Sequence, residues 1–389
     1  MKISIQQQGL SKGIDTVLDV VSSKSIVPII SNMLLEAEED YLTLSATDLD
    51  ISITTRVPAS VVDPGRITVS ARKFAEIIRE LPNAPIAIEM VDSRITISCH
   101  TGIYTEETPQ EDLSKEGIYS LMGISGDEFP NFPEYGSGED VVVKPDAQDL
   151  KDMISKTIFA VSSDETRPVL GGGLWQIEGN QMKMVATDGH RLARVSRTFT
   201  QDGASPGTIE AIVPPKALNH LVKLISGGSD LTGVTLSKSF VIFDLDTTVL
   251  FSRVIEGPYP DFEQVIPKHN EKKLVVAKDV LIPAVKRVSI LSSSQTHQIR
   301  MALENNSIEL SAVSQEIGGE ARETIVGEYS SERIEVGYNA NYLLEILRKM
   351  DSDEVMFELD SSVTVGLIKP VEQPEGQDYL CLVMPLRLN

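Results

Sequence analysis

The chain has 389 residues, of which 41% are hydrophobic and 24% are charged. This is the composition of a soluble globular protein long enough for two to four domains, and with no run near 18 apolar residues we expect no membrane-spanning helix. The formal net charge of −22 argues against nucleic-acid binding only if the charges are evenly spread, because phosphates are bound by clustered Lys and Arg.

The N-terminal third predicts a helix, a group of strands, a second helix and more strands. "MKISIQQQGL" has no apolar signal core and is read as a first strand, and Leu10, Ile14 and Val17 give one apolar face to a helix over residues 10–24. "YLTLSATDLDISITTRV" and "IAIEMVDSRITISC" alternate like strands on either side of a helix over 69–81. The acidic stretch Thr105–Glu128 is predicted to be an insertion that forms a surface loop.

The same order of elements returns twice. Helices are predicted over 149–161 and 213–225, and again over 278–291 and 339–350, with strand-like segments between and after them. The second helix of each copy has apolar residues at the offsets 0, 3, 4 and 7 that begin at Phe74, Leu218 and Leu343. The prediction is an α+β protein of three repeated domains, each of two helices packed on antiparallel sheet, with boundaries at 1–140, 141–267 and 268–389.

The predicted helices oppose the charge of the rest of the chain. They carry 14 Lys and Arg against 8 Asp and Glu, a net charge of +6, whereas the remaining residues carry 21 against 49, a net charge of −28. Solvation explains one charged helix face, but six helices with the same bias favour a surface for a polyanion such as duplex DNA, bound without base readout. The cations predicted to face it are Lys12, Lys24, Arg72, Lys73, Arg79, Lys151, Lys216, Lys223, Lys286 and Arg348.

The stretch "MKMVATDGHRLARV" in the second copy has the residue types of an active site. "ATDLDIS" occupies the same place in the first copy without the His and Arg, so "ATD" is interpreted as a structural turn in which Asp binds its local backbone. The chain has no G-x-S-x-G, P-loop or H-E-x-x-H motif, and its histidines have no metal-ligand spacing. We therefore expect no enzyme activity, metal or cofactor, with a hydrolase using Asp188 and His190 as the alternative.

Two smaller features complete this reading. The triple glycine over 171–173 has no following Lys-Ser or Lys-Thr, so it predicts a turn or a close backbone approach. Cys99 and Cys381 lie in strand-like runs and are too few for a disulfide framework, which favours a reducing cytoplasmic location.

The chain resembles the bacterial β sliding clamp family, the processivity subunit (beta) of DNA polymerase III, over nearly its whole length. The resemblance depends on the threefold repeat, "SARKFAEIIRELP", "ATDGHRLA", "YPDFEQVIP" and the C-terminal "VMPLRLN" in this order. It implies a non-enzymatic homodimeric ring, closed head to tail, whose helices line a central hole around duplex DNA. Its implied partners are the replicative polymerase, the clamp loader and repair proteins. The alternative is a protein-binding scaffold that never meets DNA.

The resemblance also implies two sets of site residues. The first and third repeats would meet through Tyr119 and Leu121 on one side and Ile290 and Leu291 on the other. Gln264, where some members carry a basic residue, and the extra Asn389 depart from the family pattern. A groove between the second and third repeats would receive short linear peptides at Leu170, Thr187, Gly189, His190, Arg191, Leu192, Pro260, Val265, Tyr342, Val363, Leu382, Met384, Pro385, Leu386 and Arg387.

Overall fold

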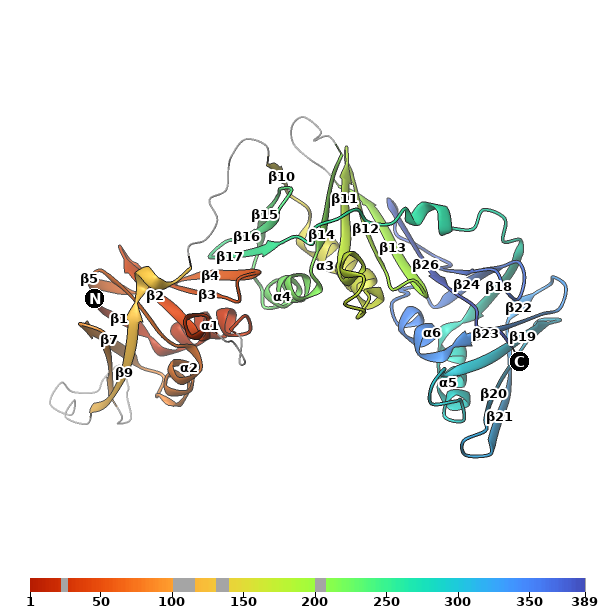
Figure 1. Ribbon diagram of the computed structural model, residues 1–389, viewed down its shortest axis with the longest axis horizontal. Coiled ribbons are helices and arrows are strands. Elements are labelled where there is room, and N and C mark those ends of the chain that lie inside the picture. Colours follow the sequence, from red (N-terminus) through yellow and green to blue (C-terminus); the bar gives the residue numbers. More distant parts are fainter. Residues whose placement is uncertain (22–26, 101–115, 131–139, 200–207, 389) are drawn as a thin grey trace. The chain divides into compact units, whose positions relative to one another are not determined.

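The computed structural model describes residues 1–21, 27–100, 116–130, 140–199 and 208–388. Within these residues no helix has the length and apolarity needed to span a membrane. Figure 1 shows helices and strands along the whole chain, which divides into two compact units. Unit 1 contains 1–147 and 216–253, and unit 2 contains 148–215 and 254–389.

The described residues contain the six predicted helices. They are α1 (Gln7–Leu18), α2 (Ala71–Glu80), α3 (Ala147–Thr157), α4 (Pro215–Ser226), α5 (Lys278–Ser289) and α6 (Ala340–Leu347). The predicted ends of α1 were wrong, because the helix begins three residues earlier and ends at Leu18. The amides of Val20 and Val21 bind carbonyls three residues back, and this tight last turn closes the helix. The α3 prediction also ran too far, since Ile158–Ala160 form a separate 3₁₀ turn, η4.

Unit 1 is built on one antiparallel sheet with helices packed against it. Arg79 of α2 is ion-paired with Asp15 of α1, and Lys223 of α4 is ion-paired with Asp19 at the C-cap of α1, so these helices are neighbours in the order α2–α1–α4. The strands follow the order β10 (Val141–Val143), β15 (Leu231–Leu236), β16 (Phe240–Leu245), β17 (Thr248–Arg253), β4 (Ile51–Pro58), β3 (Tyr41–Thr47), β2 (Asn32–Glu38), β6 (Gly65–Ser70), β9 (Glu116–Ser125), β8 (Arg94–His100), β7 (Pro85–Val91), β1 (Lys2–Gln6) and β5 (Ser60–Asp63).

Unit 2 has two sheets. Lys349, just after α6, donates a hydrogen bond to Ser155 of α3. One sheet has the order β14 (Ile209–Val213), β11 (Gly173–Glu178), β12 (Gln181–Thr187), β13 (Arg191–Thr198), β26 (Gln377–Val383), β25 (Gly366–Pro370), β24 (Glu354–Leu359), β18 (Lys272–Ala277) and β22 (Glu328–Tyr329). The other has the order β21 (Gly319–Val326), β20 (Ser307–Ser314), β19 (Gln298–Glu304) and β23 (Ile334–Asn339).

Strand pairing explains why the units do not follow the sequence repeats. In unit 1, β17 from the middle of the chain pairs with β4, with Leu250 opposite Ile53. In unit 2, β13 pairs with β26 near the C-terminus, with Leu192 opposite Leu382. Each junction continues a sheet without a break, so strands of the middle repeat belong to both units.

The interpretation of 105–128 as a surface loop was wrong for its second half. Glu116–Ser125 form β9, which pairs with β8 over 116–122 and with β6 over 123–125, and Gly126–Glu128 form a 3₁₀ turn. The alternating pattern of "GIYSLMGIS" is typical of a strand, but the acidic residues that precede it favoured a loop. Residues 105–115 lie outside the described part of the chain.

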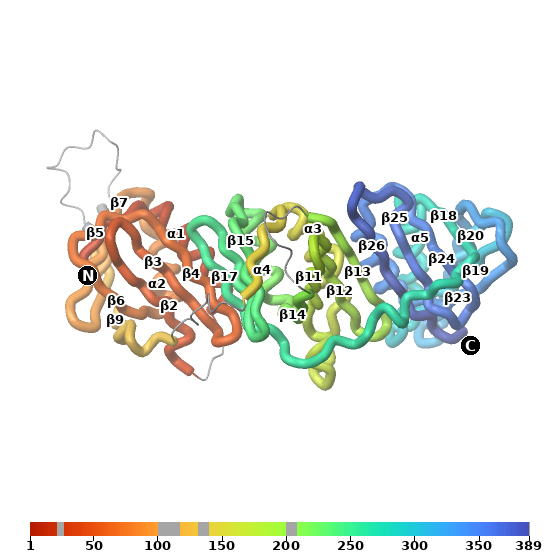
Figure 2. The backbone as a smooth tube through the Cα atoms, turned by 90° about the horizontal axis from the view of Figure 1, so that it is seen from above, coloured from red at the N-terminus to blue at the C-terminus, as the bar shows by residue number. Residues whose placement is uncertain are grey.

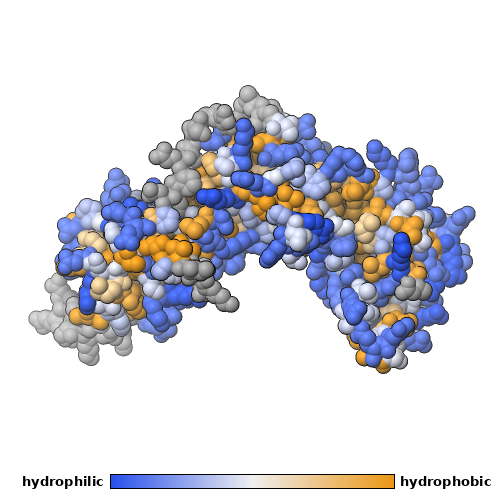
Figure 3. Space-filling view, viewed as in Figure 1, coloured by the Kyte–Doolittle hydropathy of each residue, from blue (hydrophilic) through white to orange (hydrophobic). Residues whose placement is uncertain are grey.

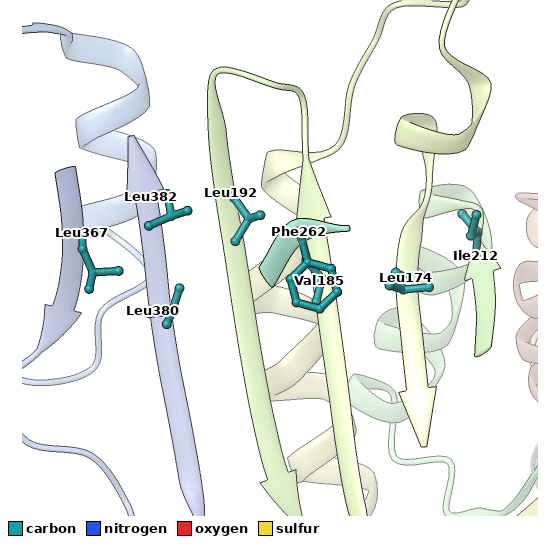
Figure 4. Packing of buried hydrophobic residues seen from close by; sticks show 8 residues of the cluster. All are labelled: Leu174, Val185, Leu192, Ile212, Phe262, Leu367, Leu380 and Leu382. Atoms are coloured by element: carbon teal, nitrogen blue, oxygen red, sulfur yellow. The ribbon is translucent and has the colours of Figure 1, made fainter. Parts of the chain in front are cut away.

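A long connecting segment covers one face of the larger sheet of unit 2. Figure 2 shows the chain after β17 running along this unit toward β18. Phe262, in the 3₁₀ turn η6 (Phe262–Val265), packs into a cluster of side chains from six strands, which Figure 4 shows at close range. The other members of this cluster are Leu174, Val185, Leu192, Ile212, Leu367, Leu380 and Leu382.

Candidate functional site

The segment "ATDGHRL" forms a tight turn between β12 and β13. The Thr187 hydroxyl accepts from the Gly189 amide at 3.1 Å and donates to the Arg191 carbonyl at 2.6 Å. Asp188 Oδ1 accepts from the amides of His190 and Arg191 at 2.8 and 3.0 Å. Gly189 has a φ of 88°, which glycine adopts without strain. The prediction that this Asp binds its local backbone is confirmed.

Arg191 is held on all sides at the start of β13. Its Nε donates to Asp188 Oδ2 at 3.1 Å and its Nη2 to the Phe159 carbonyl at 2.8 Å, while Nη1 bonds to Glu345 of α6. The guanidinium carbon also lies 4.5 Å from the Tyr342 ring centroid, and the side chain is only 9% exposed. Arg191 therefore joins β13 to α6 and has little freedom to bind a ligand through its charge.

An apolar groove lies beside this turn. It has a volume of about 190 Å³ and continues the buried cluster, because Leu192, Phe262 and Leu382 contribute to both. Its exposed apolar members are Val265 and Met384. The lining residues are Thr187, Gly189, His190, Arg191, Leu192, Pro260, Asp261, Phe262, Val265, Val365, Leu382 and Met384. Such a pocket suits an apolar anchor side chain, and Met can adapt to different anchors.

Nine of the predicted groove residues line this groove, and six lie outside its lining. Tyr342 stacks on His190 with ring centroids 6.3 Å apart, and burial raises the pKa of its hydroxyl. Leu170 is buried in the 3₁₀ turn η5 (Pro168–Gly171), whereas Val363 is 70% exposed. Pro385, Leu386 and Arg387 follow β26, where Leu386 bridges to Gly337 and the Arg387 side chain is exposed.

Sequence reasoning missed three lining residues. Asp261 and Phe262 stand inside "YPDFEQVIP", and a strand-period pattern cannot show that this irregular segment folds back over the sheet. Val365 precedes β25 and packs against the buried cluster. Gln264, which departs from the family pattern, donates to Asp261 Oδ2 at 2.8 Å and does not line the groove.

The alternative of a hydrolase receives no support from the geometry of the turn. Both carboxylate oxygens of Asp188 accept bonds from their own segment, and the His190 ring stacks on Tyr342. The triple glycine makes a close approach, because a Cβ on Gly172 would lie 2.7 Å from Ile212 Cγ2. Within the described ranges, no three His, Cys, Asp or Glu side chains cluster as metal ligands.

The remaining predicted residues are distributed over both units. Lys151 is half-buried, and Lys24 lies outside the described residues. Tyr119 and Ile290 are exposed, whereas Leu121 and Leu291 are half-buried. Cys99 and Cys381 are buried in β8 and β26 as free thiols. The predicted DNA-facing cations that are exposed are Lys12, Arg72, Lys73, Arg79, Lys216, Lys223, Lys286 and Arg348.

Comparison with known protein families shows which family the chain belongs to. Models of the DNA polymerase III beta subunit match its N-terminal domain to residues 1–133, its central domain to 145–261 and its C-terminal domain to 263–387. The chain belongs to the DNA polymerase III beta subunit family. This family is the beta sliding clamp, a non-catalytic processivity factor of DNA replication that binds DNA and partner proteins.

Individual relatives match over their full lengths. The beta sliding clamp of Caulobacter vibrioides is 32% identical, and the match covers 100% of both chains. The sliding clamp of Pseudomonas aeruginosa, solved with a ligand, superposes with a TM-score of 0.89 at 29% identity and 100% coverage of both chains. The sliding clamp of Bartonella birtlesii bound to griselimycin gives a TM-score of 0.87 at 30% identity, again with 100% of both chains covered. The three-domain α+β clamp fold predicted from the sequence is thereby confirmed.

Proposed function

We propose that the groove beside the "ATDGHRL" turn receives short linear peptides from replication proteins, and that this recruits them to the clamp. The observation that carries the proposal is the apolar pocket at the junction of β13 and β26. Its floor consists of core side chains, so it keeps its shape without a partner. Exposed Val265 and Met384 in its lining offer apolar surface that a peptide anchor would cover.

The two arginines of the proposed site have different roles. Arg191 is engaged by Asp188, Glu345 and the Phe159 carbonyl, so it shapes the groove. Arg387 is exposed next to Met384, and Gln298 Nε2 fixes its carbonyl at 3.0 Å. Arg387, rather than Arg191, therefore forms the charge-assisted bond to an acidic or polar peptide group.

The groove is tested with a polymerase-derived peptide and the double variant Met384→Ala/Arg387→Ala. We expect peptide affinity to fall at least roughly tenfold, because an apolar anchor contact and a charged contact are lost together. Val371→Ala/Lys273→Ala removes an exposed apolar residue and an exposed cation elsewhere in the same unit, and should bind like the parent. Unchanged affinity in the groove variant would reject the assignment.

The proposed ring closes where β9 of one chain meets β21 of its partner. Residues 116–122 of β9 pair with β8 on one side only, and β21 is the edge strand of its sheet. Exposed apolar side chains accompany both strands, with Ile118, Tyr119 and Met122 on β9 and Val326 on β21. Ile290, at the end of α5, is 74% exposed and belongs to the same proposed interface, with Leu121 and Leu291 behind these surfaces. Open strand edges with apolar side chains pair readily with a second chain.

The interface is tested with the variant Ile290→Glu, whose mass in solution is measured by sedimentation. The substitution would bury a charge in the interface, so the dimer should dissociate into monomers. Val363→Glu places the same charge on a valine of similar exposure outside the proposed interface and should remain dimeric. An Ile290→Glu protein that sediments as a dimer would exclude this interface.

We further propose that the cations of the helices face duplex DNA inside the closed ring. Topological retention predicts that clamps loaded on circular DNA stay bound and clamps on linear DNA slide off the ends. Reversing the charges of Arg72, Lys73 and Lys216 should weaken loading and DNA association. Equal loss from circular and linear DNA would contradict an encircling ring.

The boundaries of the three repeats, at 140 and 267, and a cytoplasmic location also belong to this proposal. Both boundaries fall between ranges matched by the domain models or within a few residues of them. Free buried Cys99 and Cys381 are compatible with a reducing compartment.

A further inference from the structure

Three cations of unit 1 that are predicted to face DNA are already bonded to carboxylates of neighbouring elements. Arg79 Nη2 on α2 donates to Asp15 Oδ1 on α1 at 2.6 Å. Lys223 Nζ on α4 donates to Asp19 Oδ2 at the C-cap of α1, also at 2.6 Å. Lys216 on α4 bonds to Asp48 in the turn between β3 and β4.

The corresponding cations of unit 2 are free of such partners. Lys151 of α3, Lys286 of α5 and Arg348 after α6 form no ion pair with any residue that the structure describes. Among the cations predicted to face DNA, the described ion pairs between elements therefore all lie in unit 1.

The paired groups of unit 1 remain open to solvent and to a ligand. A cleft of about 400 Å³ between α1 and α4 is lined by Lys12, Asp15, Asp19 and Lys223. The side chains of Asp19 and Lys223 are 49% and 67% exposed. The hydrogen bond from Lys223 lowers the pKa of Asp19, so the carboxylate is charged at neutral pH. Figure 3 shows hydrophilic residues over much of the visible surface of each unit, with apolar residues interspersed among these hydrophilic ones.

We infer that Asp15 and Asp19 are built-in counter-ions that weaken the hold of unit 1 on DNA phosphates. A phosphate that binds Arg79 or Lys223 competes with a carboxylate already within hydrogen-bond distance, so less free energy is gained from each contact. A protein that slides along DNA breaks and remakes its phosphate contacts at each step, so weak contacts favour sliding. The inference depends on the proposed DNA-facing position of the helices.

The test compares Asp15→Asn/Asp19→Asn with the parent chain. Binding to a duplex oligonucleotide is measured by fluorescence anisotropy from low to physiological salt. Diffusion of loaded clamps is followed on DNA with blocked ends. Each freed cation should strengthen binding roughly 2- to 5-fold at low salt and steepen the log–log salt dependence by about one. Diffusion should slow correspondingly.

The control is Asp92→Asn, in the turn between β7 and β8. Like each of the two counter-ion substitutions, it removes one negative charge, here from an exposed residue with no ion pair among the described residues. Its φ of 54° is tolerated by Asn. A counter-ion variant that binds DNA no more tightly than this control overturns the inference. Adding Lys223→Gln to Asp19→Asn restores the parent's net charge and should abolish that variant's gain; a gain that persists would not come from the freed Lys223 and would also overturn it.

A separate arm distinguishes failure of the inference from failure of the proposed DNA face. Lys151→Gln/Arg348→Gln removes free cations of unit 2. Weaker DNA binding in this variant, with no gain in the counter-ion variant, rejects the counter-ions and keeps the DNA face. No change in either variant rejects both.

Discussion

The turns after β3 and β12 have the same backbone and opposite electrostatics. Thr47 and Asp48 repeat the bonds of Thr187 and Asp188, since the Thr47 hydroxyl accepts from the Leu49 amide at 3.0 Å and Asp48 Oδ1 accepts from the Ile51 amide at 2.8 Å. The third residue has positive φ in both turns, 84° at Leu49 and 88° at Gly189.

Each turn forms an ion pair with a helix, and the acid and the base exchange places between the two turns. In unit 1 the turn supplies an acid, Asp48, to a base on α4, Lys216. In unit 2 the turn supplies a base, Arg191, to an acid on α6, Glu345. The shared Thr-Asp pair therefore determines the backbone, and the residues that follow determine what each junction presents. Only the second presents a buried, multiply bonded arginine beside an apolar groove.

The largest expected effect comes from removing that arginine. Arg191→Met should lower the free energy of unfolding by about 2–3 kcal/mol, because three acceptors lose a charged donor. Lys216→Met in unit 1 should cost less than about 1 kcal/mol, since Lys216 is half-exposed and its pair is weak. Urea unfolding of both variants measures the difference. Equal losses would show that the two junctions are energetically alike.

The shared threonine is the next test. Thr47→Val should cost about 2 kcal/mol and Thr187→Val about 1 kcal/mol, because Thr47 is buried and also accepts from Ser52 Oγ at 2.7 Å. Thr43→Val, on β3, serves as the control because its side chain lies outside the turn. If denaturant midpoints of the two turn variants match the control, these hydroxyl bonds do not stabilise the turns.

The residue with positive φ should respond with opposite signs in the two turns. Gly189→Ala should destabilise by about 1 kcal/mol, because a Cβ is strained at that φ and would lie 3.1 Å from Arg167 Nη1. Leu49→Gly should be neutral or stabilising by up to about 1 kcal/mol, because it relieves the same strain at an exposed side chain. Thermal unfolding of the pair gives the signs, and a loss in both would mean that Leu49 makes stabilising contacts.

The smallest expected effect is a pH dependence confined to unit 1. Burial lowers the pKa of His220 on α4, opposed by Asp19 and reinforced by Lys216 and Lys223. The unfolded chain then binds a proton at higher pH than the folded chain, so stability contributed by neutral His220 is present above about pH 6.5 and is lost as pH falls through the folded pKa. His220→Gln should flatten unfolding free energies between pH 7.5 and 5.5. An unaltered slope would assign the dependence to another group.

The sequence by itself determined the repeated elements, because helix and strand periodicity are local properties of apolar spacing. Phe74, Leu218 and Leu343 mark equivalent helices wherever they pack, and the Thr-Asp turn forms from bonds within five residues. The same local reasoning failed at Glu116–Ser125, where the partner strands β6 and β8 lie at other positions along the chain.

Only the tertiary structure decided what the local elements do. The groove requires β13 to pair with β26, more than 180 residues away in sequence, and requires the segment at Phe262 to fold over both. This packing also decides which cations are paired within the chain. Arg191 is bonded to Glu345, whereas the Arg387 side chain is exposed. Lys223 is paired with Asp19, whereas Arg348 has no ion pair among the described residues. Sequence spacing does not encode these partners, since the contacts form across sheets and helices that no short segment contains.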